Sequence, residues 1–230
     1  MKPIYLMLHA LTIAFPLIRS FEPRVKYAKK WIALFPAITI TATVFIIWDV
    51  IFTENGVWGF NNQYLIGYSI LHLPIEEWLF FITVPFASVF IYECVFVFTK
   101  IRSTPLLRTF STVIGLALVL LAVYNAERAY TFWAFCLTGV FLTIISSSNP
   151  RWLGKFWLAY ALHLIPFVLV NGILTGSFLE APIVWYNDDQ NLGIRLFTIP
   201  IEDSIYALLL LLMNVSFFQY FKKHFIQTKH

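Results

Sequence analysis

Charged side chains are scarce in this chain of 230 residues. Only 12% of the residues are Asp, Glu, Lys or Arg, whereas 60% are hydrophobic and 19% aromatic, and the mean hydropathy is +0.76. An average soluble domain has about 25% charged residues, so this chain has too little charge to coat a water-soluble globule of its size. The scarcity excludes an ordinary cytosolic domain, a disordered chain and a coiled coil, and it leaves an integral membrane protein.

Several motifs that bind nucleotides, cofactors or metals are also missing. The sequence has no Gly-x-Gly-x-x-Gly fingerprint, no P-loop lysine and no His/Glu zinc motif. The two cysteines, Cys94 and Cys136, lie in apolar stretches and are expected to be small buried side chains. The adjacent acids Asp188 and Asp189 lie in a loop and are typical of a solvated turn. We therefore expect no metal and no cofactor, and the net charge of +4 does not indicate nucleic acid because topology explains it.

Long apolar runs are what the chain has in abundance. A membrane-spanning helix needs about 20 mainly apolar residues, and seven segments qualify, of which the first and fourth are short. Their approximate bounds are 3–19, 31–52, 75–99, 107–124, 129–147, 156–175 and 199–221. The last segment has no lysine before Lys222, so it lacks the mid-span lysine that a seven-span opsin needs. The sequence predicts an all-α integral membrane protein with seven transmembrane helices.

The basic residues divide unequally between the two sides that seven spans create. Thirteen fall on one side: Arg19, Arg24, Lys26, Lys29, Lys30, Lys100, Arg102, Arg108, Arg151, Lys155, Lys222, Lys223 and Lys229. Three fall on the other side: Lys2, Arg128 and Arg195. Because cytoplasmic loops carry the excess of Lys and Arg, this split predicts a plasma-membrane protein with its N-terminus outside and its C-terminus in the cytoplasm.

Three motifs recur, in the same order, in the two halves of the chain. The most informative is Pro-Ile-Glu-Glu at 74–77, which resembles Pro-Ile-Glu-Asp at 200–203, an offset of 126 residues (200 − 74). The other two pairs match a helix end and a loop: Trp-Asp-Val-Ile-Phe-Thr at 48–53 with Val-Asn-Gly-Ile-Leu-Thr at 170–175, and Val-Trp-Gly-Phe-Asn at 57–61 with Val-Trp-Tyr-Asn at 184–187. Chance similarity between apolar helices is common, but matching Trp, Gly, Pro and acidic positions in order is not.

We interpret the chain as two parallel three-helix repeats joined by a linking helix. The first repeat is 1–104, the linking helix lies in 105–126, and the second repeat is 127–230. Parallel repeats are related by an axis along the membrane normal, as in some transporters, and place a binding site at their interface. A site built from both repeats is therefore expected.

The candidate catalytic residues are the acids of the two Pro-Ile-Glu motifs: Glu76, Glu77, Glu202 and Asp203. Taken singly, acids in a first helical turn are ordinary helix-start signals. Carboxylates at a membrane are costly, however, and are functional candidates by default. The aromatic-rich loops 54–73 and 176–198 are expected to fold over the acids, and the loss of hydration would favour their protonated form. Since Glu76 and Glu202 are equivalent positions, we expect both to face a shared cavity.

These motifs resemble those of the heterodimeric-type lycopene cyclases. The resemblance lies in the Trp-Asp…Phe-Thr…Gly-Val-Trp-Gly-Phe-Asn run at 48–61 and in Pro-Ile-Glu-Glu at 74–77. In that family two small homologous membrane polypeptides, or one fused chain, cyclise the ends of lycopene, and this chain is similar to the fused form because it carries both copies. The second copy departs from the first at Asp203, which replaces Glu77, and at 185–187, so whether both copies carry catalytic acids stays open.

The resemblance implies β-cyclisation of lycopene, or of another long isoprenoid, taken from the bilayer. It implies membrane lipid around the protein and other carotenoid-pathway enzymes as possible partners. A carboxyl acid and base would move the protons, and aromatic faces would stabilise the carbocation by about 2 kcal/mol or more once it is desolvated. The side chains expected to contact substrate lie in the loops and near the helix ends: Trp58, Phe60, Asn61, Trp78, Phe80, Trp185, Tyr206 and Asp49.

Two other functions fit parts of this pattern. A small-solute transporter with seven spans and parallel repeats would need a polar, water-filled path with broken helices. Here the acids gather at one side, and the middle of the bundle is almost purely apolar. A non-catalytic subunit of a carotenoid membrane complex would share the topology and the resemblance without doing the chemistry.

Overall fold

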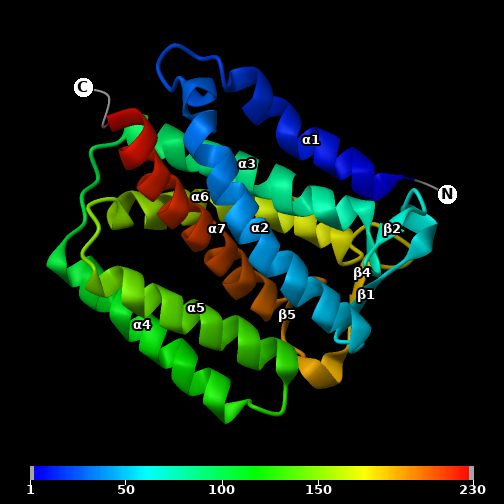
Figure 1. Cartoon of the computed structure of the whole chain (residues 1–230). Coiled ribbons are helices and arrows are strands. Elements are labelled where there is room, and N and C mark those ends of the chain that lie inside the picture. Colours follow the sequence, from blue (N-terminus) through cyan, green and yellow to red (C-terminus); the bar gives the residue numbers. More distant parts are fainter. Residues whose placement is uncertain (1–2, 228–230) are drawn as a thin grey trace.

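The computed structural model describes residues 3–227, and within them the chain forms a bundle of seven α-helices (Figure 1). The helices are α1 (Ile4–Arg19), α2 (Trp31–Glu54), α3 (Ile75–Phe98), α4 (Pro105–Tyr124), α5 (Ala129–Ser147), α6 (Leu153–Leu174) and α7 (Ile201–Lys222). Six of them, α2 to α7, are long and apolar enough to cross a membrane. The predicted all-α architecture and its seven helices are confirmed for the described residues.

Helix α1 is the exception in length. It has 16 residues, so at about 1.5 Å per residue it extends about 24 Å, less than the hydrocarbon core of about 30 Å. It is nevertheless apolar, and it packs along α3. The first predicted span is thus a helix that is shorter than the others.

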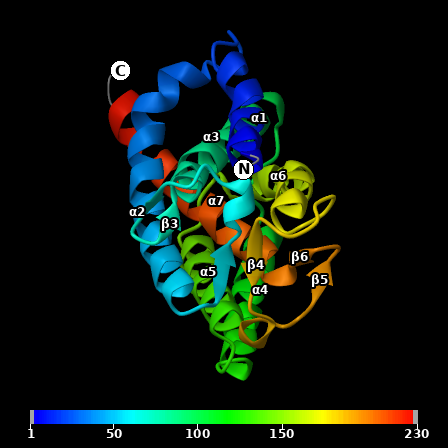
Figure 2. The same ribbon diagram turned by 90° about the vertical axis from the view of Figure 1, so that its right-hand side faces the viewer.

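Short elements connect the long helices or, in one case, follow the last of them. Four are single helical turns: η1 (Tyr27–Lys30), η2 (Asn62–Tyr64), η3 (Asp188–Gln190) and η4 (Lys223–Gln227). Six are short strands: β1 (Trp58–Phe60), β2 (Ser69–Ile70), β3 (Leu73–Pro74), β4 (Val184–Tyr186), β5 (Arg195–Leu196) and β6 (Ile199–Pro200). All six strands lie at the same end of the bundle (Figures 1 and 2).

Helix α7 is the centre of the bundle. It packs against α2, α3, α5 and α6, and its residues are buried without interruption from Ala207 to Val215. Its apolar residues can pack on protein from every side, since a helix that is hydrophobic all round needs no face in water. The single polar residue in that run, Asn214, donates to the Leu210 carbonyl oxygen at 2.8 Å.

The linking helix α4 lies away from this centre and packs mainly on α5 (Figure 1). Two glycines allow the close approach of the pair. A Cβ at Gly115 would lie 2.3 Å from Thr143 Oγ1, and one at Gly139 would lie 2.5 Å from the Gly115 carbonyl oxygen. Small residues at helix contacts are typical of membrane bundles, because packing rather than the hydrophobic effect drives helix association there.

The two long loops meet over the helix ends and form a cap. Strand β1 of the first loop pairs antiparallel with β4 of the second, with Trp58 opposite Tyr186 and Phe60 opposite Val184. Figure 2 shows this pairing beside the ends of α2, α3 and α6. Backbone hydrogen bonds therefore join the two predicted repeats directly.

The same local structure starts α3 and α7. Strands β2 and β3 form a two-residue antiparallel ladder before α3, and β5 and β6 form one before α7. The backbone N–H of Ile75 donates to Tyr68 at 3.0 Å, and that of Ile201 donates to Ile194 at 2.9 Å. Each helix then begins after a proline, whose missing N–H is not needed in a first turn.

The opposite end of the bundle is basic. It holds the residues of the larger basic group except Lys229, which like Lys2 lies outside the described residues. One acid, Glu93 of α3, is buried there and forms ion pairs with Lys30 and, at 2.6 Å, with Lys222 Nζ. This ion-pair cluster ties α3 to α7 and to the turn before α2.

We expect this basic end to face the cytoplasm, because of its excess of Lys and Arg. A green fluorescent protein fused to the C-terminus should fluoresce, and alkaline phosphatase fused there should be inactive. Glu180 is exposed in the loop at the capped end, so a Glu180→Cys variant should react with a membrane-impermeant maleimide in intact cells. The reverse result in both assays would overturn the orientation.

Breaking the ion-pair cluster should destabilise the fold. Glu93→Gln leaves Lys30 and Lys222 facing each other without their counter-charge, and removing one partner of a buried pair costs about 3–5 kcal/mol. The variant should therefore unfold at a clearly lower temperature in detergent. Glu22→Gln is the control, because the Arg19–Glu22 pair is largely exposed and such pairs contribute about 0–1 kcal/mol. Equal Tm values for the two variants would contradict the expectation.

Candidate active site

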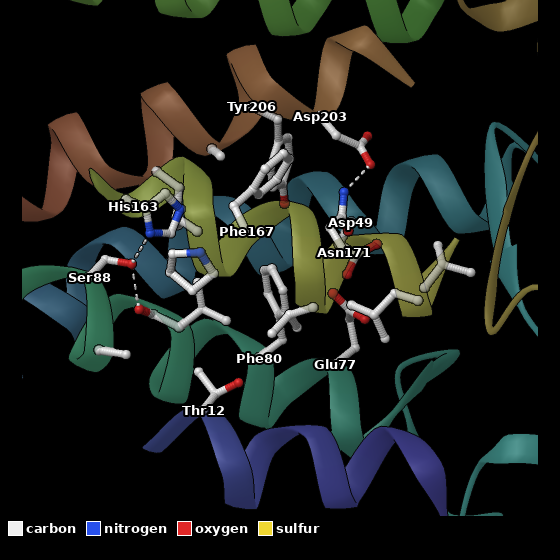
Figure 3. Close-up of a pocket in the computed structure, with 18 of the residues that line it drawn as sticks. Thr12, Asp49, Glu77, Phe80, Ser88, His163, Phe167, Asn171, Asp203 and Tyr206 are labelled. Atoms are coloured by element: carbon white, nitrogen blue, oxygen red, sulfur yellow. Dashed lines mark hydrogen bonds between the residues drawn. The ribbon is translucent and has the colours of Figure 1, made fainter. Parts of the chain in front are cut away.

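A pocket lies in the bundle beneath the cap, and its empty volume, including its open mouth, is about 940 Å³. Helices α1, α2, α3, α5, α6 and α7 and strands β1 and β4 all contribute side chains to it. Its walls are mainly aromatic and aliphatic, and three carboxyl groups enter from Asp49, Glu77 and Asp203 (Figure 3). Farther from the cap it is lined by Ser88 and His163, whose Oγ and Nδ1 atoms are 3.0 Å apart.

Glu77 reaches the pocket from the first turn of α3. The hydroxyl of Tyr5 on α1 donates a hydrogen bond to Glu77 Oε2 at 2.5 Å, and both residues are buried. His9 stacks on the Tyr5 ring with centroids 4.7 Å apart, and its Nδ1 lies 2.9 Å from Thr83 Oγ1. Helix α1 therefore positions Glu77 even though it is short for a membrane span.

Asp203 occupies the equivalent position on α7 and has more donors. Tyr130 on α5 donates to Oδ1 at 2.5 Å, and Oδ2 accepts from Asn171 Nδ2 at 2.7 Å and from the Tyr186 hydroxyl at 3.0 Å. Tyr186 lies in the cap, where burial, together with the charge of Asp203, holds the pKa of its phenol well above the usual value of about 10. Tyr186 therefore stays protonated and remains a donor to Asp203.

Asp49 is the third carboxyl of the pocket and comes from the last turns of α2. Its Oδ1 accepts from Trp58 Nε1 at 2.5 Å and from Thr53 Oγ1 at 3.4 Å. Its Oδ2 is buried and has no hydrogen-bond partner within residues 3–227. Asp49 thus places one unpaired polar atom in a largely apolar site.

Glu76 and Glu202 do not line the pocket, so the expectation that they face a shared cavity is wrong. Both are fully buried, but each accepts a hydrogen bond from the loop before its helix: Glu76 Oε1 from Ile66 N at 2.7 Å and Glu202 Oε1 from Leu192 N at 2.8 Å. Glu202 also accepts from Thr131 at 2.7 Å. Neighbouring residues of a helix point about 100° apart, so one acid of each motif holds the loop while the next one enters the pocket.

Five of the eight predicted substrate contacts line the pocket, and three do not. The five are Asp49, Trp58, Phe60, Phe80 and Tyr206. The other three hold the cap together. Asn61 accepts from Gln63 N at 3.0 Å, Trp78 Nε1 donates to Ile70 at 3.2 Å, and Trp185 packs over Gly59, where a Cβ would lie 2.4 Å from its ring. Their positions in the loop motifs serve loop structure, and contact of these three with substrate stays a prediction.

Aromatic rings surround the three carboxyls. Tyr206 lies 5.1 Å from Trp48 between ring centroids, and Trp58 lies 5.1 Å from Tyr130. Tyr130 in turn stacks on Tyr186 at 5.7 Å. Such faces attract a cation, so the pocket combines proton-carrying groups with a wall that can stabilise positive charge.

Tyr5 and Tyr130 are site residues that motif matching does not identify. They hold Glu77 and Asp203 in the same way, and they are 125 residues apart (130 − 5), close to the offset of the Pro-Ile-Glu motifs. Tyrosines are common near membrane interfaces, so in the sequence only the spacing of these two, close to the repeat offset, could have identified them as site residues.

The model of the lycopene cyclase family matches this chain at residues 2–95 and again at 127–221. Searches of curated proteins and of solved structures found no match. The two matched segments contain the helices and strands that line the pocket and leave out the linking helix α4. Because these segments cover most of its length, the chain belongs to the lycopene cyclase family.

Proposed function

We propose that this chain is a lycopene β-cyclase that closes β-ionone rings by a proton-initiated reaction without net oxidation or reduction. The observation that supports it most is the set of three carboxyls, Asp49, Glu77 and Asp203, in one apolar and aromatic pocket. Both family-matched segments contribute to that pocket. We further propose that 1–104 and 127–230 are two cyclase repeats that share one site, with 105–126 as their linker.

The reaction needs an acid, a base and an apolar pocket wall that keeps water away from the cation. A carboxylic acid adds its proton to the terminal alkene of lycopene, which leaves a tertiary cation. The next alkene attacks that cation and forms the ring bond, and the loss of a proton from a neighbouring carbon then leaves the ring alkene. Carboxyls positioned beside the reacting atoms can serve as general acid and base, and the rings of Trp58 and Tyr206 can stabilise the intermediate cations.

The shape of the pocket suits one end of a long polyene. Along α3 the lining runs from Glu77 to Ile91, which is about 21 Å at about 1.5 Å per residue. The carboxyls lie at the capped end, and side chains such as Phe80, Val84 and Leu210 lie farther along. An extended carotenoid is longer than this stretch, so one end group would meet the acids while the rest of the chain extends outward.

We assign different tasks to the two acids of each motif. Glu77 and Asp203 enter the pocket and would exchange protons with the substrate, whereas Glu76 and Glu202 hold the loops of the cap. Asp49 would act together with Glu77. This division replaces the equal roles that the sequence motif suggests.

The direct test is expression in lycopene-accumulating bacteria. The pigment should shift to a product of unchanged mass that carries one or two β-ionone rings, measured by chromatography and mass spectrometry. Membranes supplied with unlabelled lycopene in D₂O should place one deuterium on each new ring, because the added proton comes from exchangeable carboxyls. Unchanged lycopene, with the protein confirmed in the membrane, would favour a non-catalytic subunit or a transporter instead.

The assigned tasks predict a contrast between neighbouring acids. Glu77→Gln and Asp203→Asn remove a positioned acid or base and should lower the cyclisation rate about 10²–10⁴-fold. Glu76→Gln and Glu202→Gln keep an acceptor oxygen for Ile66 N and Leu192 N, so they should retain most of the activity. Rates are compared at equal amounts of membrane-inserted protein. Equal losses for Glu76→Gln and Glu77→Gln would contradict the assignment.

A further inference from the structure

The two repeats differ at one pair of pocket residues. Asp49 near the end of α2 aligns with Asn171 near the end of α6, and both line the pocket. Each accompanies the second acid of a Pro-Ile-Glu motif: Asp49 accompanies Glu77, and Asn171 donates to Asp203. One repeat therefore supplies two carboxyls, and the other supplies a carboxyl and an amide.

The Asp49–Glu77 half favours a bound proton. Both residues line the pocket, and Figure 3 shows their carboxyl groups directed into the same part of it. Within residues 3–227, Glu77 accepts from one side-chain donor, Tyr5, and Asp49 accepts only at Oδ1, because its Oδ2 has no partner. The two carboxyls of this half thus share three side-chain donors, whereas Asp203 alone has three. Two carboxylates in one apolar site repel each other, so one member of such a pair keeps its proton.

The Asp203 half favours the opposite state. Its carboxyl accepts three hydrogen bonds, from Tyr130, Asn171 and Tyr186. An amide NH₂ can only donate, so Asn171 needs an acceptor oxygen on Asp203. Hydrogen bonds to a carboxylate stabilise its charged form, and the geometry therefore suits a proton acceptor.

Resting on the proposed function, we infer that the Asp49–Glu77 pair is the proton donor and that Asp203 is the proton acceptor. The pair transfers its proton to the terminal alkene carbon, where a C–H bond forms as the π bond breaks. The ring bond then forms from the next alkene and moves the positive charge onto a ring carbon. Asp203 removes a proton from the adjacent carbon, whose C–H electrons become the ring alkene. Return of that proton from Asp203 to the pair restores the starting state, and the carotenoid keeps its elemental composition.

Deuterium exchange separates a missing donor from a missing acceptor. Membranes that contain each variant are incubated with lycopene in D₂O, and the deuterium content of products and recovered lycopene is measured. Glu77→Gln should leave lycopene uncyclised and unlabelled, because no proton is delivered. Asp203→Asn should also slow ring formation about 10²–10⁴-fold, yet its recovered lycopene should carry deuterium, because protonation still occurs and reverses.

Asn171→Asp provides a second test that leaves every acid in place. A carboxyl beside Asp203 would make that half hold a proton as well, so this variant should behave like Asp203→Asn. Asp203→Glu keeps the acceptor and should recover part of the activity. The exposed acid Glu180 gives a matched control, and Glu180→Gln should cyclise at the wild-type rate.

The outcomes distinguish the two proposals. If the wild-type chain does not cyclise lycopene, the proposed function fails. If the wild type cyclises but Asp203→Asn and Asn171→Asp both leave unlabelled lycopene, or if Glu77→Gln yields labelled lycopene, the division of roles is wrong. Misfolding of Asp203→Asn would appear as a changed size-exclusion elution of the detergent-solubilised variant. In that case the results for Asn171→Asp and Asp203→Glu decide whether Asp203 is the acceptor.

Discussion

The structure depends on keeping carboxyl groups inside an apolar bundle. A buried carboxyl is costly unless hydrogen bonds satisfy it, and here the donors come from other helices. Tyr5 of α1 serves Glu77 of α3, and Tyr130 of α5 serves Asp203 of α7. The need to satisfy two acids therefore fixes which helices must be neighbours. It also explains why α1, too short to span the core comfortably, packs against α3 beside Glu77.

The cap follows from the same constraint, and it makes one site out of two repeats. The first acid of each motif accepts a backbone N–H from its own loop, which draws both loops over the helix ends. There β1 and β4 pair. Trp58 then contacts both repeats, since it donates to Asp49 of the first and packs on the ring of Tyr130 in the second. Because the pocket walls are mainly apolar, each polar contact in the pocket is stronger than it would be in solvent.

Composition and apolar length were enough to predict the helices, and the repeated motifs were enough to predict the acidic segments. The sequence did not indicate which way each acidic side chain points from its helix. Helix α3 is apolar around most of its circumference, so no polar face in its sequence marks the side that turns toward the pocket. The sequence therefore cannot distinguish the position of Glu76 from that of Glu77. The same limit applies to Trp78 and Trp185, whose loop contacts depend on strand register. Tyr5 and Tyr130 became visible as partners only through distances between helices that are far apart in the sequence.

The difference between Asp49 and Asn171 shows what a fused pair of repeats can do that two identical halves cannot. Identical halves would present the same acids from both sides, and their carboxyls would titrate together and repel one another. A proton-initiated cyclisation needs one group that holds a proton and another that lacks one. In the mechanism we propose, replacing a carboxyl by an amide in one half supplies that difference without altering the helix framework, because Asn171 still occupies the helix end and hydrogen-bonds to the neighbouring acid. The asymmetry of the site thus resides in side-chain chemistry, on a scaffold whose local structure repeats.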